Sequence, residues 1–344
     1  MTGGGVDLAA LAAEAVPEAL VERLRRARSV VAVSHENPDA DTIGAVIGIC
    51  LLVEALGGRA TAVCSDPVPP LYAFLDGVER FRQDPEPSAA YDLLVLADCA
   101  TAERVGAVAA RHPELFTELP RAVVDHHASN SAIGAADWID PGAAATCELV
   151  TLLAARLEVP LTAGDGALAA ALMAGIVMDT ATFAHPNATP RTLAVSAELV
   201  GAGAPLSDIS RRLYRTKPDA QLKLFGRVLD RLETTPDRLV IWSTLLEADL
   251  ADTGSIGAHS EGIIDLLGQS ETAEVAMLLK EGHDGTTRLS VRTKPGGVDA
   301  TLLCGTWGGG GHTRAAGATI PLPLDAAVAA AWGEAGRLAA AVER

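Results

Sequence analysis

Residues 29–42, SVVAVSHENPDADT, lead from a short apolar run, through a loop with one imidazole and two carboxylates, into a helix. The run Ser29–Ser34 is too continuously apolar for a half-exposed strand and is typical of a parallel sheet covered on both faces. The helix predicted at Thr42–Leu56 is apolar nearly all round, which indicates burial against that sheet. Ligands of open α/β sheets bind at the loops after the carboxyl ends of the strands, so this loop is a candidate site.

The same alternation of strand and helix continues through the first half of the chain. Three more apolar runs are predicted to be strands of this sheet, at 60–65, 92–97 and 121–124. Further helices are predicted at 17–28, 143–157 and 167–178. This order predicts an α/β domain with a doubly wound, mainly parallel sheet.

The second half of the chain has a different pattern. Residues 206–237 are rich in Lys and Arg and are predicted to be a helical linker. After them, strands are predicted at 239–245, 273–280, 287–293 and 315–320, and helices at 260–267, 298–304 and 324–340. We therefore expect a first domain at 17–205, the linker at 206–237 and a smaller α+β domain at 238–344, with a cleft between the two domains.

The composition limits the classes of partner. Of the 344 residues 49% are hydrophobic, enough for a full core, and the formal net charge of -17 repels long nucleic acid without excluding a small anion held by metal ions. The longest uncharged apolar stretch, Gly166–Met178, is too short for a membrane helix, and no basic residue precedes Arg23, so we expect neither a membrane span nor a signal peptide. The five cysteines show no CxxC spacing, which favours buried thiols in a reducing cytoplasm.

Acidic and imidazole side chains follow three successive predicted strands and end one buried helix. Alone, each has a structural interpretation: Asp41 as a helix cap, His35 as a loop histidine, Asp98 as a turn residue. Together they indicate one site, because oxygen and nitrogen ligands in this number suit a pair of divalent ions such as manganese. The six candidate ligands are His35, Asp39, Asp41, Asp98, His126 and Asp179.

Four glycines followed by a histidine, Gly308–His312, lie in the second domain. Glycines leave backbone N–H groups open to the approach of an anion, although such a run is also typical of a flexible loop. Arg292 and Lys294 on a nearby predicted strand favour phosphate or nucleotide binding.

These motifs resemble those of the DHH-type phosphoesterases. In the first domain the matching stretches are His35–Asp41, Leu96–Asp98, Asp125–Asn130 and Gly175–Thr180. The second domain resembles the DHH-associated nucleic-acid-binding domain through Ser290–Arg292, Gly308–His312 and Ala315–Gly317. Thr293 and Ala181-Thr182 depart from the family pattern, which often has serine and Gly-Ser at these positions.

The resemblance implies a role for each motif residue. One manganese ion would be held by His35, Asp39 and Asp98, and the other by Asp41, Asp98, His126 and Asp179, with Asp98 bridging. His127 would contact the scissile phosphate, and Asp125 would orient a histidine. The second phosphate or nucleotide of the substrate would be held by Arg292, Gly310, Gly311 and His312.

The bacterial nanoRNase/pAp phosphatases are the most similar group in size and layout, and their actinobacterial members also resemble cyclic di-AMP phosphodiesterases. The resemblance therefore implies a manganese-dependent hydrolase, with magnesium as another possible ion, that acts on short oligoribonucleotides, pApA or pAp in the cytoplasm as a homodimer. Two alternatives stay open: a manganese-dependent inorganic pyrophosphatase, and a non-catalytic nucleotide-binding regulator.

Overall fold

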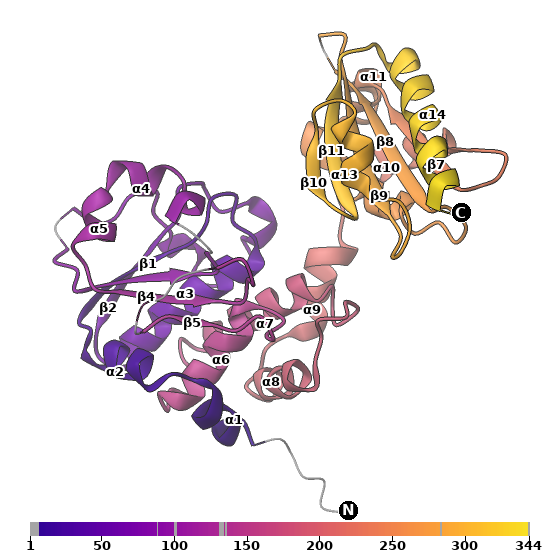
Figure 1. The fold of residues 1–344 in the computed structure, drawn as a ribbon. Coiled ribbons are helices and arrows are strands. Elements are labelled where there is room, and N and C mark those ends of the chain that lie inside the picture. Colours follow the sequence, from indigo (N-terminus) through magenta and orange to yellow (C-terminus); the bar gives the residue numbers. More distant parts are fainter. Residues whose placement is uncertain are drawn as a thin grey trace, which may run out of the picture. The chain divides into compact units, whose positions relative to one another are not determined.

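The computed structural model describes residues 7–87, 89–99, 102–130, 134, 136–282 and 284–342. It divides the chain into two compact units, Met1–Thr216 and Lys217–Arg344 (Figure 1). The division falls inside the predicted linker: helix α9 (Leu206–Ser210) belongs to the first unit and helix α10 (Asp219–Asp230) to the second.

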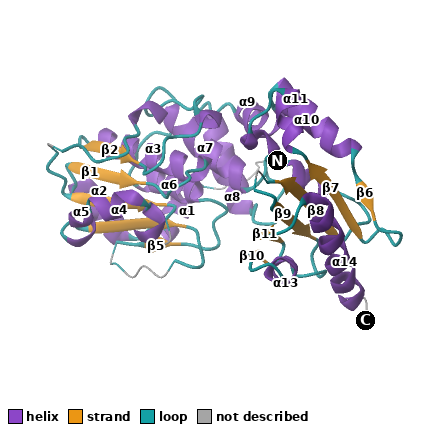
Figure 2. Ribbon diagram, turned by 90° about the horizontal axis from the view of Figure 1, so that it is seen from above, coloured by secondary structure: helices purple, strands orange, loops and turns teal. Residues whose placement is uncertain are grey.

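The first unit contains a five-stranded sheet in the order β2-β1-β3-β4-β5, and every neighbouring pair is parallel (Figure 2). The strands are β1 (Ser29–Val33), β2 (Arg59–Val63), β3 (Leu93–Ala97), β4 (Arg121–Asp125) and β5 (Trp138–Ile139). The first four lie where the apolar runs predict them. The sequence missed β5, because a two-residue edge strand has no apolar run of its own.

Helices cover both faces of this sheet, which confirms the predicted doubly wound α/β class. One face packs against α1 (Leu8–Ala15), α2 (Glu18–Arg26), α3 (Ala40–Ala55), α6 (Thr146–Arg156) and α7 (Ala167–Asp179). The other packs against α4 (Ala107–Arg111) and α5 (Pro113–Thr117). Alternate residues of β1 belong to the hydrophobic cores on the two faces of the sheet. Val30 and Ala32 face α3, α6 and α7, and Val31 and Val33 face α4 and α5. Helix α8 (Pro190–Gly201) packs on α6 and α7.

The second unit contains a six-stranded mixed sheet in the order β10-β11-β9-β8-β7-β6. Its strands are β6 (Glu233–Thr234), β7 (Val240–Leu245), β8 (Val275–Glu281), β9 (Thr287–Thr293), β10 (Gly310–His312) and β11 (Ala315–Ile320). Helices α13 (Ala300–Gly305) and α14 (Leu324–Val342) cover one face, and α10, α11 (Glu247–Thr253) and α12 (Ile263–Leu267) cover part of the other (Figure 1). The predicted α+β class is confirmed, and the end of the glycine run, Gly310–His312, forms strand β10.

The sequence predicts buried cysteines and no membrane-spanning helix. All five cysteines are buried, and none of them forms a disulfide. Within the described part of the chain, no helix combines the length and the apolar character that crossing a membrane would need.

Helix α3 lies very close to α7 because both carry a glycine at the contact. A Cβ added at Gly44 would lie 2.3 Å from the carbonyl oxygen of Ala171 and 2.9 Å from Sγ of Cys147. A Cβ added at Gly175 of α7 would lie 2.9 Å from Cα of Asp41 in α3, and 2.4 Å from the same Sγ of Cys147 in α6. This close approach brings the beginning of α3 to the end of α7.

We predict that Gly44→Ala lowers the free energy of unfolding by about 1–3 kcal/mol, because an extra methyl group in a packed core forces the backbones apart. Urea denaturation monitored by circular dichroism measures the loss. Gly201→Ala in the same unit is the matched control, since a Cβ there meets nothing within 4 Å. Equal stability of the two variants would contradict the account of the α3–α7 contact.

Candidate metal centre

The candidate ligands come from five elements of the first unit. His35 follows β1, Asp98 follows β3, and Asp125 ends β4 just before His126 and His127. Helix α3 contributes Asp41 from its first turn, and α7 contributes Asp179 as its last residue. Because the strands are parallel, their carboxyl ends meet at one edge of the sheet, and the side chains after them gather there.

His35 presents one ring nitrogen to the cluster. Its Nδ1 lies 2.7 Å from the carbonyl oxygen of Glu36, so Nδ1–H donates to that oxygen and Nε2 faces the carboxylates. Nε2 lies 3.5 Å from Oδ2 of Asp98 and 3.9 Å from Oδ1 of Asp39. A backbone acceptor on the distal nitrogen is the usual way in which a metal-binding histidine is oriented.

His126 lies between the other carboxylates. Its Nε2 is 3.2 Å from Oδ2 of Asp179, 3.6 Å from Oδ1 of Asp98 and 3.8 Å from Oδ2 of Asp41. The described residues thus contain three overlapping groups whose potential ligand atoms lie within 4.8 Å of one another. The three groups are His35/Asp39/Asp98, Asp41/His126/Asp179 and Asp98/His126/His127.

This donor set fits a pair of divalent ions. The six candidate ligands offer only carboxylate oxygens and imidazole nitrogens, the chemistry that manganese and similar ions prefer. Asp98 and His126 each belong to two of the groups, so the groups are adjacent parts of one cluster.

Backbone and hydroxyl groups at the beginning of α6 hold two of the carboxylates. The N–H groups of Thr146 and Cys147 donate to Oδ2 and Oδ1 of Asp41, at 2.7 and 2.9 Å. The hydroxyl of Thr146 donates to Oδ1 of Asp98 at 2.9 Å. Sequence reasoning missed Thr146, although its place near the beginning of a predicted helix after a loop was a usable signal.

The helix cap of α3 is Asp39 and not Asp41. Oδ1 of Asp39 accepts the N–H groups of Asp41 and Thr42, at 3.0 and 3.1 Å. The capping interpretation of Asp41 is therefore wrong. Both oxygens of the fully buried Asp41 are held by α6, whose N-terminal dipole stabilises a negative charge.

The cluster holds more acidic groups than it can charge without a cation. Burial, followed by the nearby charges of Asp98 and Asp39, raises the pKa of Asp179 to about 8. Burial, followed by the charges of Asp98 and Asp179, raises the pKa of Asp41 well above its usual range. Burial alone would raise the pKa of Asp98 too, but the hydrogen bond with His35 and the charge of His126 lower it. A bound divalent cation would relieve this repulsion.

Asp125 holds His127 in a fixed orientation. Nδ1 of His127 lies 2.8 Å from Oδ1 of Asp125, and the other oxygen of Asp125 accepts a hydrogen bond of 2.6 Å from the amide of Asn130. This hydrogen bond to Asp125, although opposed by burial, raises the pKa of His127. The pair therefore directs Nε2 of His127 away from Asp125 and favours the protonated ring.

The segment after Asp179 has an unusual backbone. Ala181, Thr182 and Phe183 have φ values of 48°, 59° and 63°, in the left-handed region that costs a residue with a side chain about 1–3 kcal/mol. The buried Thr180 closes this turn: its hydroxyl accepts the N–H of Phe183 at 2.9 Å. His185 is exposed, and its Nδ1 lies 3.1 Å from the carbonyl oxygen of Asp179.

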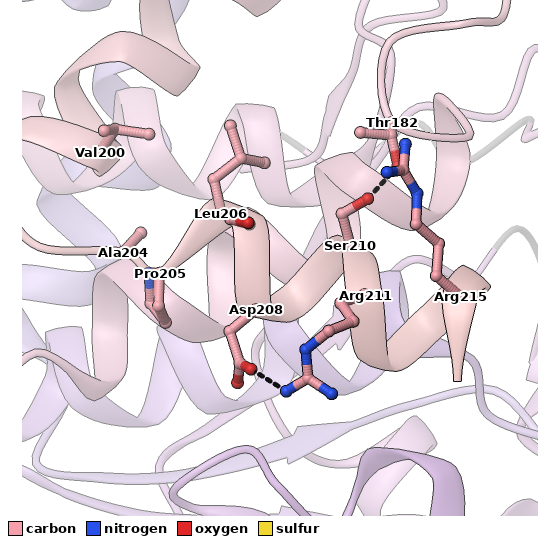
Figure 3. A pocket seen from close by; sticks show the side chains of 10 residues that line it. Thr182, Val200, Ala204, Pro205, Leu206, Asp208, Ser210, Arg211 and Arg215 are labelled. Atoms are coloured by element: carbon pink, nitrogen blue, oxygen red, sulfur yellow. Dashed lines mark hydrogen bonds and ion pairs between the residues drawn. The ribbon is translucent and has the colours of Figure 1, made fainter. Parts of the chain in front are cut away.

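A hollow of about 900 Å³ borders this turn (Figure 3). Thr182 lines it together with the end of α8, the beginning of α9 and the side chains of Arg211 and Arg215. Thr182 bonds through its hydroxyl to that of Ser210 at 2.9 Å, and Arg211 pairs with Asp208. None of the candidate ligands lines this hollow, so it is separate from the metal centre.

The predicted substrate-binding residues of the second unit lie on two strands of its sheet, β9 and β10, which are separated by β11. Arg292 is on β9, and its Nε donates to Oδ1 of Asp265 at 2.8 Å. The exposed residues Gly310 and His312 lie on β10, opposite Gly317 and Ala315 of β11. Gly311 has a φ of 146°, and a Cβ there would lie 2.4 Å from the carbonyl oxygen of Ala315. The N–H groups of Gly308 and Gly309 donate to carbonyls of Gly305 and Cys304, so they are not open to an anion.

Two family models match this chain, one in each unit. The model of the DHH family, N-terminal domain, matches residues 29–176, and the model of the DHHA1 domain matches residues 245–336. The chain belongs to the DHH family of phosphoesterases and is an enzyme of that class. This agrees with the resemblance that the motifs indicate.

Two bacterial relatives share the layout over most of their length. The chain is 32% identical to the bifunctional oligoribonuclease and PAP phosphatase NrnA of Thermus thermophilus, over 86% of this chain and 85% of the relative. It is 26% identical to the protein of the same name from Bacillus subtilis, over 90% of this chain and 92% of the relative. The solved structure of an exopolyphosphatase-related protein from Bacteroides fragilis has the same fold, with a TM-score of 0.81 at 19% identity over 95% of this chain and 98% of that one.

We predict that Thr146→Val weakens manganese binding roughly 10–100-fold, because the loss of an outer-shell hydrogen bond to a ligand has effects of that size. Valine removes the hydroxyl that holds Asp98 but keeps the backbone N–H that holds Asp41. Isothermal titration calorimetry with MnCl₂ measures the affinity, and Thr146→Ser, which keeps the hydroxyl, is the control. An unchanged affinity in the valine variant would show that the hydroxyl does not orient Asp98.

The raised pKa of Asp179 predicts that the metal-free protein loses stability as pH rises from about 4 to about 8. Folded Asp179 keeps its proton over that range, whereas the unfolded carboxyl releases it, so the unfolding free energy falls by up to ~1.4 kcal/mol per pH unit. The raised pKa values of His35 and His127 act in the same direction above their ordinary value.

Urea denaturation in EDTA at a series of pH values measures this slope. The side chain at position 179 of Asp179→Asn has no proton to release, so the unfolding free energy of this variant should depend less on pH. Adding divalent ions at pH 8 should raise the unfolding free energy of the wild type. Stability that rises steadily over this range in both proteins would contradict the electrostatic account.

Proposed function

We propose that the chain hydrolyses phosphoester bonds of short oligoribonucleotides and of pAp, releasing mononucleotides, with two divalent ions as cofactors. The observation that carries the proposal is the overlap of three metal-binding groups at Asp98 and His126. The relatives named as oligoribonuclease and PAP phosphatase support the choice of substrate.

Six side chains would hold the ions. We assign His35, Asp39 and Asp98 to one ion, and Asp41, Asp98, His126 and Asp179 to the other, with Asp98 shared. Bound divalent ions supply Lewis-acid activation of water and of the phosphoryl group. Thr146 and the N-terminus of α6 keep Asp98 and Asp41 in place.

His127 is placed to act on the substrate. Asp125 fixes its Nδ1, which leaves Nε2 free to donate a hydrogen bond to a phosphoryl oxygen. A protonated ring also serves as a general acid for the leaving oxygen, and the raised pKa of His127 favours that form near neutral pH.

Arg292, Gly310, Gly311 and His312 would bind a second phosphate or nucleotide. Arg292 pairs with Asp265, which fixes the orientation of its guanidinium. Phosphate recognition by so few residues reconciles a chain of net charge -17 with a nucleotide substrate, because only a short substrate needs to be bound.

Several finer assignments belong to the same proposal. We propose manganese as the resident ion and magnesium as a weaker substitute. We place the enzyme in the cytoplasm, which suits its five buried cysteines, none of which forms a disulfide. Cyclic di-AMP or its linear product pApA is a further substrate, the protein acts as a homodimer, and long duplex nucleic acid is not bound.

We predict that manganese-dependent release of AMP from pApA and pAp falls by at least about 10³-fold in Asp98→Asn, because a ligand shared by both ions loses its charge. Product analysis by ion-exchange chromatography, on a panel of pAp, pApA, cyclic di-AMP, short RNA and pyrophosphate, measures it. Asp165→Asn, at an exposed turn of the first unit where φ is 56°, is the control and should keep the activity of the wild type.

Each part of the panel can contradict the proposal. Faster turnover of pyrophosphate than of any nucleotide would favour the pyrophosphatase. Nucleotide binding without turnover or metal binding would favour the regulator. Full activity of Asp98→Asn would exclude the metal assignment.

A further inference from the structure

One face of the second unit's sheet carries Arg292, and helices cover this face mainly over β7 and β8. Leu289 and Val291 of β9 point into the core under α13 and α14. Side chains alternate along a strand, so Arg288, Ser290 and Arg292 lie on the opposite face. On that face α10–α12 pack against apolar residues of β7 and β8, and β9, β11 and β10 extend beyond them.

Two cations stand opposite each other on this face. Lys280 of β8 is paired in register with Arg288 of β9, and Thr319 of β11 is the neighbour on the other side. Like charges directly opposite across strands are destabilising. The pairing therefore lowers the stability of the sheet, and within the described residues neither side chain has a carboxylate partner.

The surroundings neutralise this pair only in part. Nζ of Lys280 donates to the hydroxyl of Ser260 at 2.7 Å, and Arg288 is exposed. Burial, followed by the charge of Arg288, lowers the pKa of Lys280, and the charge of Glu261 offsets a part of this shift. An anion bound between the two side chains would remove this repulsion.

Two hollows meet at the pair. One of about 490 Å³ runs past Ser290 and Gly317 to Trp307 and the glycines that begin the Gly308–His312 run. The other, of about 920 Å³, is lined by Leu245 and Leu250 and also by three acidic residues, Glu261, Glu281 and Asp284. Lys280, Arg288 and Thr319 line both hollows. The smaller hollow has no acidic residue among the described residues that line it. It combines two cations, which attract a phosphate, with an aromatic ring on which a base can stack.

We propose that Lys280 and Arg288 form a second phosphate subsite, which binds the backbone of an oligoribonucleotide beyond the nucleotide held at Arg292. The proposal rests on the proposed function. Arg288 and Arg292 are four residues apart on one strand, so their Cα atoms are about 13 Å apart. A substrate that reaches both positions needs more linkages than a dinucleotide has, so this subsite favours substrates of about four or five nucleotides.

The test is a comparison of substrate lengths in Lys280→Gln/Arg288→Gln, which removes both charges and keeps side-chain bulk. KM and kcat are measured with manganese for pApA and for pentaadenylate. We expect KM for pentaadenylate to rise about tenfold relative to KM for pApA, because a charge-assisted hydrogen bond to phosphate is lost, while kcat stays within twofold. The slope of log KM against log salt should also become shallower for the pentanucleotide.

The control is Lys223→Gln/Arg238→Asn, which removes two exposed charges from the same unit outside both hollows and should change neither substrate. Asparagine suits position 238, where φ is 63°. Equal rises of KM for both lengths, or no rise for either, would overturn the subsite. Absence of turnover in the wild type would instead overturn the proposed function. The fluorescence anisotropy of labelled pentaadenylate would then test the subsite alone. An unchanged affinity of Lys280→Gln/Arg288→Gln for this ligand would reject the subsite.

Discussion

The mutual repulsion of buried carboxylates at the end of one sheet is the constraint on which the rest of the first unit depends. Asp41 and Asp98 are almost inaccessible to solvent, and Asp179 joins them from the end of α7. Burying several acids together is unfavourable unless protons or cations neutralise them. The N-terminus of α6 supplies its helix dipole, two backbone N–H groups and the hydroxyl of Thr146. These groups fix the positions of Asp41 and Asp98, but they do not neutralise the charge of the carboxylates. The fold therefore gathers acidic groups whose mutual repulsion a bound divalent cation would relieve.

The scaffold makes that arrangement possible through close packing. The glycines of α3 and α7 let the two helices approach until Asp41 and Asp179 meet. The strained turn after Asp179 is held by Thr180 and by the packing of the following helices. Strain of this kind persists where the surroundings fix it, and it is common at functional sites. The second unit also contains an unfavourable interaction, because the like charges of Lys280 and Arg288 face each other across two strands. This pair lies beside the predicted nucleotide site.

Much of the fold could be predicted from the sequence, because continuous apolar runs and apolar helices leave few other structures for residues 29–179. The candidate ligands could be predicted because they follow those runs directly. The role of Asp39 as the cap of α3 could not, since two neighbouring aspartates are equivalent in sequence. Thr146 and strand β10 were missed for a related reason. A hydroxyl that contacts Asp98 from 48 residues away, and a glycine run paired with Ala315–Gly317, depend on long-range contacts that no local pattern carries.

The most direct test of the central claim is a crystal structure of the protein grown with MnCl₂, with anomalous diffraction data collected near the manganese edge. The account predicts two anomalous peaks about 3.5–4 Å apart, both within bonding distance of Asp98 and one beside His35, the other beside His126. A single peak elsewhere on the surface, or none at saturating manganese, would contradict it.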